Sequence, residues 1–256
     1  MDFYAFLPSN ANPNIYPDNK TSNYRIQLAK RMELTGHWQA ALVEAHYPNT
    51  IEQVTDGENM IKITHRNGTE DVYYVRPGHY VKLDNFLFEL HEALTPLETV
   101  PNDKGRSSVV ELTEGSYILF HPFLTVPDAT YTFSTRLAMQ LGLLHSGPYP
   151  TQTELCGTNP IDLNLGVPPQ LFIYLDKIDD QIVGHTRVPL LRTVPTEINE
   201  RYGSMLIYHF EQPLYFDLTT KCFDTLEINI RDHTRKLVPF SSGTSMLLVH
   251  FKPVHN

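Results

Sequence analysis

Hydrophobic and polar residues alternate with a period of two along much of the chain. The alternation is clearest in residues 24–28, 41–45 and 226–230. Alternation of this kind is typical of strands that bury one face and expose the other. Residues 171–175 and 246–251 are apolar on both faces, which predicts that they form central strands of a β-sandwich.

Two segments show helical spacing instead. Apolar residues recur every three or four positions in residues 83–94, with Asp84 as a candidate N-cap and Pro96 as the stop. A second, shorter helix is predicted within residues 134–144, capped by its first or second residue. Gly142 lies inside this second segment and weakens it as a helix by about 1 kcal/mol relative to Ala.

Turn signals and long polar loops complete the pattern. Asn67-Gly68 separates the apolar runs 61–63 and 72–75, and this predicts a hairpin because Asn-Gly supplies the positive φ of a tight turn. Residues 9–22 and 145–169 are loops of 14 and 25 residues, and loops longer than about 12–15 residues are usually functional or mobile. Many strands at short spacing, with two helices in the connections, predict an all-β sandwich.

Composition narrows the class of function. The 256 residues carry a net charge of −9, which disfavours nucleic-acid binding because phosphate contacts need clustered Lys and Arg. No run of 18 apolar residues exists, so we expect no membrane span, and the first eight residues lack the features of a signal peptide. Cys156 and Cys222 are expected to stay reduced, although the two could also pair.

No pattern of catalytic or metal-binding residues stands out. None of the 12 histidines is spaced as His-x-His or His-x-x-x-His, and residues 91–95 begin like a zinc helix motif but end in Thr. Asp176, Asp179 and Asp180 could suggest calcium, but they match no ordered calcium loop, so a solvated turn is favoured. The sequence therefore predicts no catalytic residue, no cofactor and no metal site, and an enzyme with a dispersed site is the least favoured class.

Short motifs in a fixed order carry a resemblance to a known family. They comprise residues 3–10 (FYAFLPSN), 16–19 (YPDN), 34–44 (LTGHWQAALVE), 134–138 (STRLA), 181–184 (QIVG), 188–192 (VPLLR), 227–232 (EINIRD) and 238–240 (VPF). Together they resemble the minor capsid, or penton, protein of Maverick/Polinton elements and the related adintoviruses. The resemblance runs from about residue 3 to about residue 252 and so covers almost the whole chain.

The resemblance implies a fold, a function and partners. The implied fold is a single jelly-roll β-sandwich of two four-stranded antiparallel sheets with one or two short helices in loops. It is expected to occupy residues 1–256 as one domain and to leave no room for a large inserted domain. The implied function is a non-enzymatic structural virion protein that forms homopentamers at capsid vertices. Its implied partners are a double-jelly-roll major capsid protein and a host receptor or fibre, without direct nucleic-acid binding.

Physical reasoning adds candidate contacts and one alternative function. A ring of identical chains needs head-to-tail contacts that close by rotation, and residues 9–22 and 145–169 are the candidate segments for them. The alternative is a jelly-roll module that binds a glycan or a receptor. An exposed aromatic platform around Trp38, Tyr149 or Tyr202 would favour this alternative, although Trp38 is more typical of a core aromatic.

Overall fold

The chain divides into two compact units. The computed structural model describes residues 2–97, 110–122, 126, 128–197 and 200–254. Unit 1 comprises Met1–Ile51 with Pro168–Asn256, and unit 2 comprises Glu52–Val167. Unit 2 is inserted into the chain of unit 1, and the single domain expected over residues 1–256 stays a prediction. Unit 2 holds 15 acidic and 7 basic residues, a net charge of −8, whereas unit 1 holds 14 acidic and 13 basic residues, a net charge of −1, so the negative charge of the chain is concentrated in the inserted unit.

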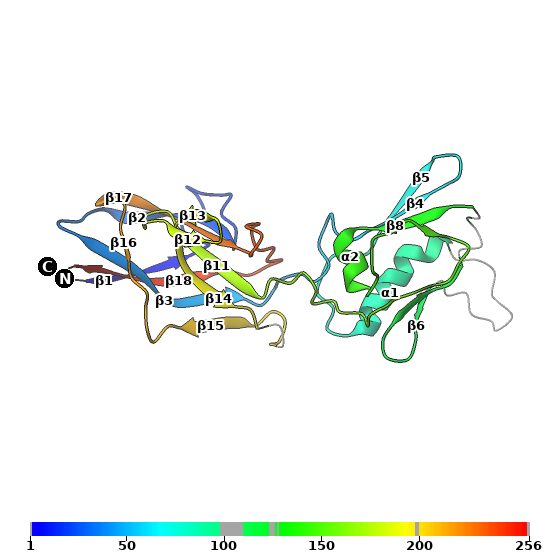
Figure 1. Ribbon diagram of the computed structural model, residues 1–256. Coiled ribbons are helices and arrows are strands. Elements are labelled where there is room, and N and C mark those ends of the chain that lie inside the picture. The colour runs from blue at the N-terminus through cyan, green and yellow to red at the C-terminus, as the bar shows by residue number, and fades with distance from the viewer. Residues whose placement is uncertain (1, 98–109, 123–125, 127, 198–199, 255–256) are drawn as a thin grey trace. The chain divides into compact units, whose positions relative to one another are not determined.

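Unit 1 is a sandwich of two antiparallel sheets (Figure 1). The first sheet has the order β1-β18-β3-β15, with β16 also paired to β3, and the second has the order β14-β11-β17-β2. The strands of the first sheet are β1 (Phe3–Pro8), β18 (Met246–Pro253), β3 (Trp38–Pro48), β15 (Met205–His209) and β16 (Phe216–Asp217). The strands of the second are β14 (Leu190–Pro195), β11 (Gln170–Leu175), β17 (Cys222–Arg231) and β2 (Asn23–Glu33). These sheets confirm the predicted all-β jelly-roll class.

The hydrophobic pattern explains which strands are central. β18 pairs with β1 on one side and with β3 on the other, and β11 pairs with β14 and β17. Both strands were predicted to be central from their apolar runs, and this is confirmed. Tyr24 and Phe251 are almost fully buried between the sheets, and the Tyr24 hydroxyl donates to the Leu7 carbonyl at 3.2 Å. A small hairpin, β12 (Gln181–Val183) with β13 (Thr186–Val188), completes the unit.

Unit 2 combines two small antiparallel sheets with two helices. One sheet has the order β5-β4-β8-β9, and its strands are β4 (Met60–Thr64), β5 (Glu70–Tyr74), β8 (Thr130–Phe133) and β9 (Tyr149–Pro150). The other has the order β10-β7-β6, and its strands are β6 (Val110–Leu112), β7 (Ile118–Phe120) and β10 (Leu155–Cys156). The predicted hairpin is confirmed as β4–β5, and Gly68 has the expected positive φ of 84°. The unit has a core of its own around Phe86, Leu90 and Phe120.

The first predicted helix is confirmed, but its cap is not. Helix α1 spans Leu83–Leu94, and a 3₁₀ turn, η1, follows at Thr95–Leu97 and contains Pro96. The N-cap position is Lys82, without a side-chain cap, and Asp84 lies within the first turn instead. There the negative charge of Asp84 interacts favourably with the positive end of the helix dipole, and its side chain makes no capping hydrogen bond.

The second helix is shorter than its pattern because Gly142 ends it. Helix α2 spans Thr135–Gln140, with Ser134 at the N-cap. Gly142 has φ 74° and donates its N–H to the Met139 carbonyl, while the next residue, Leu143, donates to the Ala138 carbonyl. These two bonds form the Schellman motif that glycine favours at helix ends. The interpretation of Gly142 as an interior helix residue is therefore wrong. In the described part of the chain, no helix has the length and apolar character needed to cross a membrane.

Candidate assembly surfaces

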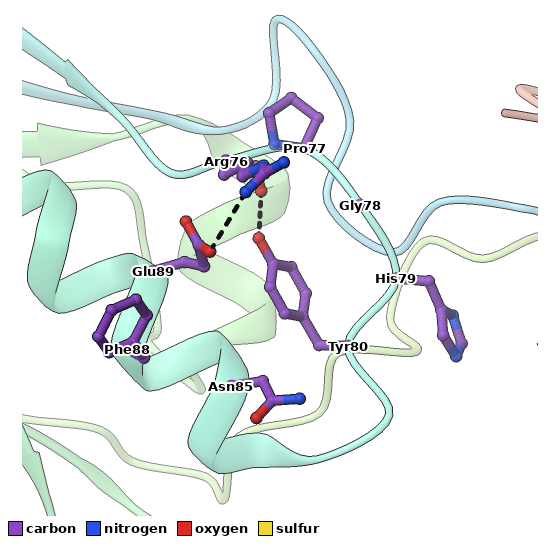
Figure 2. A pocket seen from close by; sticks show the side chains of 8 residues that line it. All are labelled: Arg76, Pro77, Gly78, His79, Tyr80, Asn85, Phe88 and Glu89. Atoms are coloured by element: carbon purple, nitrogen blue, oxygen red, sulfur yellow. Dashed lines mark hydrogen bonds and ion pairs between the residues drawn. The ribbon is translucent and has the colours of Figure 1, made fainter.

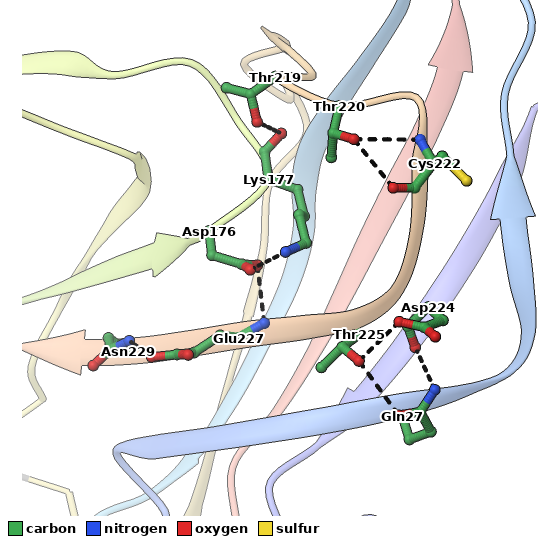
Figure 3. Close-up of polar contacts among 10 residues, drawn as sticks. All are labelled: Gln27, Asp176, Lys177, Thr219, Thr220, Cys222, Asp224, Thr225, Glu227 and Asn229. Atoms are coloured by element: carbon green, nitrogen blue, oxygen red, sulfur yellow. Dashed lines mark hydrogen bonds and ion pairs between the residues drawn. The ribbon is translucent and has the colours of Figure 1, made fainter.

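The acidic residues that follow β11 serve the fold. One Asp176 oxygen accepts a hydrogen bond from the Glu227 N–H at 2.9 Å, and the other pairs with Lys177 (Figure 3). Asp179 and Asp180 are exposed on the turn.

Among the described residues, no three His, Cys, Asp or Glu side chains are grouped to hold a metal ion. Of the 12 histidines, His255 lies outside the described residues. Cys156 and Cys222 are free thiols and form no disulfide with each other.

Two of the proposed platform aromatics lie at opposite ends of β3. Trp38 begins the strand and packs with its ring centroid 5.8 Å from that of Phe3. Tyr202 lies near the other end, since the neighbouring Gly203 donates its N–H to the Asn49 carbonyl just after the strand. Eleven strand residues separate the ends by roughly 33 Å. A platform around Trp38 would therefore be separate from one around Tyr202.

The segment 145–169 is built into the fold. Most of it belongs to unit 2 and supplies β9 and β10. Tyr149 stacks on His145 with ring centroids 4.8 Å apart, so its ring already has a partner. The buried Gln140 amide donates to the Leu163 carbonyl at 2.9 Å, which fixes the middle of the segment. The role predicted for this segment in contacts between copies stays a prediction.

The segment 9–22 is tied down at several points along its length. The Ser9 N–H donates to the Ser245 carbonyl at 2.8 Å, and the Asn19 amide donates to the Arg25 carbonyl at 2.8 Å. The segment therefore has a fixed shape that a second molecule could meet, and its predicted contact role also stays a prediction.

The sandwich has two edges where a strand from each sheet is left without a neighbour on one side. In the described part of the chain, β1 pairs only with β18, and β2 pairs only with β17. A groove of about 310 Å³ lies between these two edge strands and is lined mainly by residues 3–7 and 28–32. We call these residues the β1–β2 flank. Tyr4 and Phe6 of this flank are 56% and 63% exposed, which is unusual for large aromatic side chains.

The opposite edge carries a second apolar surface. Among the described residues, β15 pairs only with β3, and β14 pairs only with β11. Met205 and Ile207 on β15 are 47% and 51% exposed. Arg192 of β14 lies 4.6 Å above the ring of Phe210, which links the two edge strands on this side. We call residues 190–195 and 205–210 the β14–β15 flank.

The residues in and around the two flanks differ in charge. Strand β2 carries exposed Arg25, Lys30 and Arg31 against a single acidic residue, Glu33. The β14–β15 flank itself holds Arg192 and no acidic residue, but the residues that adjoin β15 include three Glu (Glu197, Glu200 and Glu211) against Arg201. Where these bordering residues meet in an assembly, their opposite charges favour pairing of unlike flanks over pairing of like flanks.

A row of charged side chains lies between the flanks on the first sheet. Glu44 of β3 contacts His46 at 3.0 Å through one oxygen and His209 of β15 at 3.1 Å through the other. The hydrogen bond from His46 is the main cause that lowers the pKa of Glu44 below its ordinary value, and the charge of His209 acts in the same direction. Glu44 thus joins β3 to the edge strand β15 and helps to fix the β14–β15 flank.

Sequence reasoning did not find either flank. Residues 3–7 are apolar at almost every position, and such a run looks like a buried strand. Only the strand order shows that β1 is an edge strand with one side open. The open side therefore became visible only once the long-range pairing with β18 was known.

A comparison with solved structures relates the fold to that of a viral penton protein. No family model matches the chain, and no curated protein matches its sequence. Among solved structures, the chain is similar to the mavirus penton protein, with a TM-score of 0.51 and 9% identity over 99% of this chain and 100% of that one. It is also similar to a chain in the structure of the Sputnik virophage determined by cryo-EM, with a TM-score of 0.46 and 10% identity over 98% and 97% of the two chains. The likeness to the mavirus protein confirms the predicted penton-type fold.

Proposed function

We propose that this chain is a penton-type minor capsid protein, of which five copies form a closed ring at a vertex of an icosahedral capsid. The observation that carries the proposal is the match in fold to the mavirus penton protein over the full length of both chains. The ordered sequence motifs that resemble penton proteins of Maverick/Polinton elements support it independently.

The two flanks supply what a ring requires. A ring of identical chains needs two different, complementary surfaces on each chain, because the contact is head-to-tail. The β1–β2 flank and the β14–β15 flank end opposite edges of the same sandwich, and both expose apolar side chains. In the proposed ring, the β1–β2 flank of one copy packs against the β14–β15 flank of the next.

The role is structural rather than catalytic. The further partners are a double-jelly-roll major capsid protein around the ring and a host receptor or fibre on its outer side, and the location is the virion. The net charge of −9 per chain disfavours direct contact with the packaged genome.

Native mass spectrometry of the purified chain tests the proposal. We expect a species of five times the 29.4 kDa chain mass, which appears at high protein concentration or on addition of the major capsid protein. Negative-stain electron microscopy should show the same species as rings with five-fold symmetry. A chain that stays strictly monomeric under both conditions and joins no capsid-like particle would overturn the proposal.

A further inference from the structure

A hollow in unit 2 lies between helix α1 and the loop segment 76–80 before it. Its volume is about 370 Å³, within the range of small-ligand sites. It is lined by Arg76, Pro77, Gly78, His79, Tyr80, Asn85, Phe88 and Glu89, which come from two short stretches of the chain (Figure 2). The proposed ring surfaces all belong to unit 1, so the ring does not account for this hollow.

Two aromatic side chains give the hollow its apolar surface. Phe88 is 61% exposed on α1, where it contributes nothing to the buried core of the unit. The ring of Tyr80 stands between Asn85 and the Arg76–Glu89 pair (Figure 2). Tyr80 is held in place by its hydroxyl, which donates to the Arg76 carbonyl, and by an edge contact with Phe86 at 5.5 Å between ring centroids. A fixed ring beside an exposed ring is a surface on which a flat apolar face can stack.

Polar groups with unused hydrogen-bonding capacity surround the rings. Asn85 and Glu89 are four residues apart on α1 and so lie on the same side of the helix. The Asn85 amide has no hydrogen-bond partner among the described residues. The Glu89 carboxylate is 3.9 Å from the Arg76 guanidinium, too far for a hydrogen bond, so both groups can still bind a ligand.

This combination fits one class of ligand. An amide, a carboxylate and a guanidinium are planar groups that bind adjacent hydroxyls in pairs, while the C–H face of a sugar ring stacks on an aromatic face. An anionic ligand is disfavoured because Arg76 already faces Glu89. We propose that the hollow lined by Arg76, Tyr80, Asn85, Phe88 and Glu89 binds an uncharged pyranose of a glycan.

The proposed site differs from the platform predicted from the sequence. None of Trp38, Tyr149 and Tyr202 lines the hollow. Its signal in the sequence is weak but real: the apolar stripe of the helix runs through Leu83, Phe86, Leu90 and Leu94, and Phe88 lies off that stripe. A single exposed aromatic is common on protein surfaces, so Phe88 becomes informative only through its place beside the hollow.

A glycan array with the full-length chain tests the site. The array displays both neutral and acidic glycans, and saturation-transfer NMR with the free sugar then checks each hit. We expect binding to neutral glycans, and Phe88→Ala and Asn85→Ala should each weaken it by at least about tenfold. Phe88→Trp should retain binding because it keeps an aromatic face. Tyr74→Ala is the matched control, since Tyr74 is a 60% exposed aromatic in the same unit and does not line the hollow.

Three results would overturn the proposal: no neutral glycan bound, binding restricted to acidic glycans, or binding that both alanine variants keep. Thermal unfolding identifies a variant that fails to fold, and Glu89→Gln then replaces it in the comparison. The readout is independent of ring formation, because the NMR measurement detects monovalent binding to a monomer as well as to a ring.

Discussion

Replacing Phe6 with Glu should block one of the two ring surfaces and leave the other intact. Phe6 is 63% exposed on the β1–β2 flank, so the chain can fold without burying it. A Phe side chain buries about 150–250 Å² when fully covered, so the exposed part amounts to roughly 120 Å². At about 25 cal/mol per Å², covering it in the ring is worth about 3 kcal/mol per contact, or about 100-fold in the dissociation constant.

The substitution Ile207→Glu should block the other surface for the same reason. Ile207 is 51% exposed on the β14–β15 flank, and a carboxylate there would have to be buried next to apolar groups. Each variant alone should therefore be monomeric under conditions where the wild-type chain forms rings. Tyr74→Glu and Val72→Glu on β5 are matched controls, because both positions are exposed and belong to unit 2, and they should leave the rings intact.

Mixing the two variants separates head-to-tail contact from like-with-like contact. The Phe6→Glu chain keeps an intact β14–β15 flank, and the Ile207→Glu chain keeps an intact β1–β2 flank. If these flanks pair with each other, an equimolar mixture forms heterodimers that cannot grow further. Native mass spectrometry with one chain isotopically labelled measures this species. A mixture that contains only monomers, or a Phe6→Glu chain that still forms pentamers while folded, would refute the assignment of the flanks.

Three further substitutions test the packing and the polar contacts within the two units. Leu90→Ala should lower the free energy of unfolding of unit 2 by about 2–5 kcal/mol in a urea titration, because the Leu90 side chain is fully buried. A loss below about 1 kcal/mol would contradict this packing. Gly142→Ala should lower the melting temperature of the same unit in calorimetry, because the added methyl group would lie 1.9 Å from the Asn159 carbonyl oxygen and Gly142 has a positive φ. An unchanged melting temperature would contradict that contact. Because the pKa of Glu44 is lower in the folded chain than its ordinary value of 4.5, the Glu44 carboxylate stabilises the fold at pH values above 4.5. This stabilisation is lost as the pH falls below 4.5 and through the lowered pKa. The difference in melting temperature between wild type and Glu44→Gln should therefore be larger at pH 7 than at pH 3, and an equal difference would refute the contact with His46.

The strands were predictable where the pattern was long. Residues 226–230 alternate cleanly, and they lie in β17, a ten-residue strand whose burial alternates in the same way. Residues 246–251 are apolar on both faces because β18 lies between two other strands. In both segments the local pattern and the final environment agree, so sequence reasoning succeeds.

Unit 2 was not predictable for the opposite reason. Its strands β6 and β7 have only three residues each, too few to show a period. Its core brings together Phe86, Phe120 and Leu141, which are separated by tens of residues in the sequence. The information that makes this segment a unit therefore lies in long-range contacts, and a single sequence does not display them.

The site of insertion explains how one chain can carry both proposed activities. Unit 2 begins after β3 and ends before β11, and neither of these is an edge strand of its sheet. The four edge strands that form the two flanks are thus left uninterrupted by the insertion. Five copies in a ring would present five hollows at once. A glycan-bearing surface on which several glycans reach several copies together would then bind the ring far more tightly than one sugar binds one copy. In this arrangement the binding strength comes from the ring, whereas the specificity comes from Phe88 and the polar groups beside it.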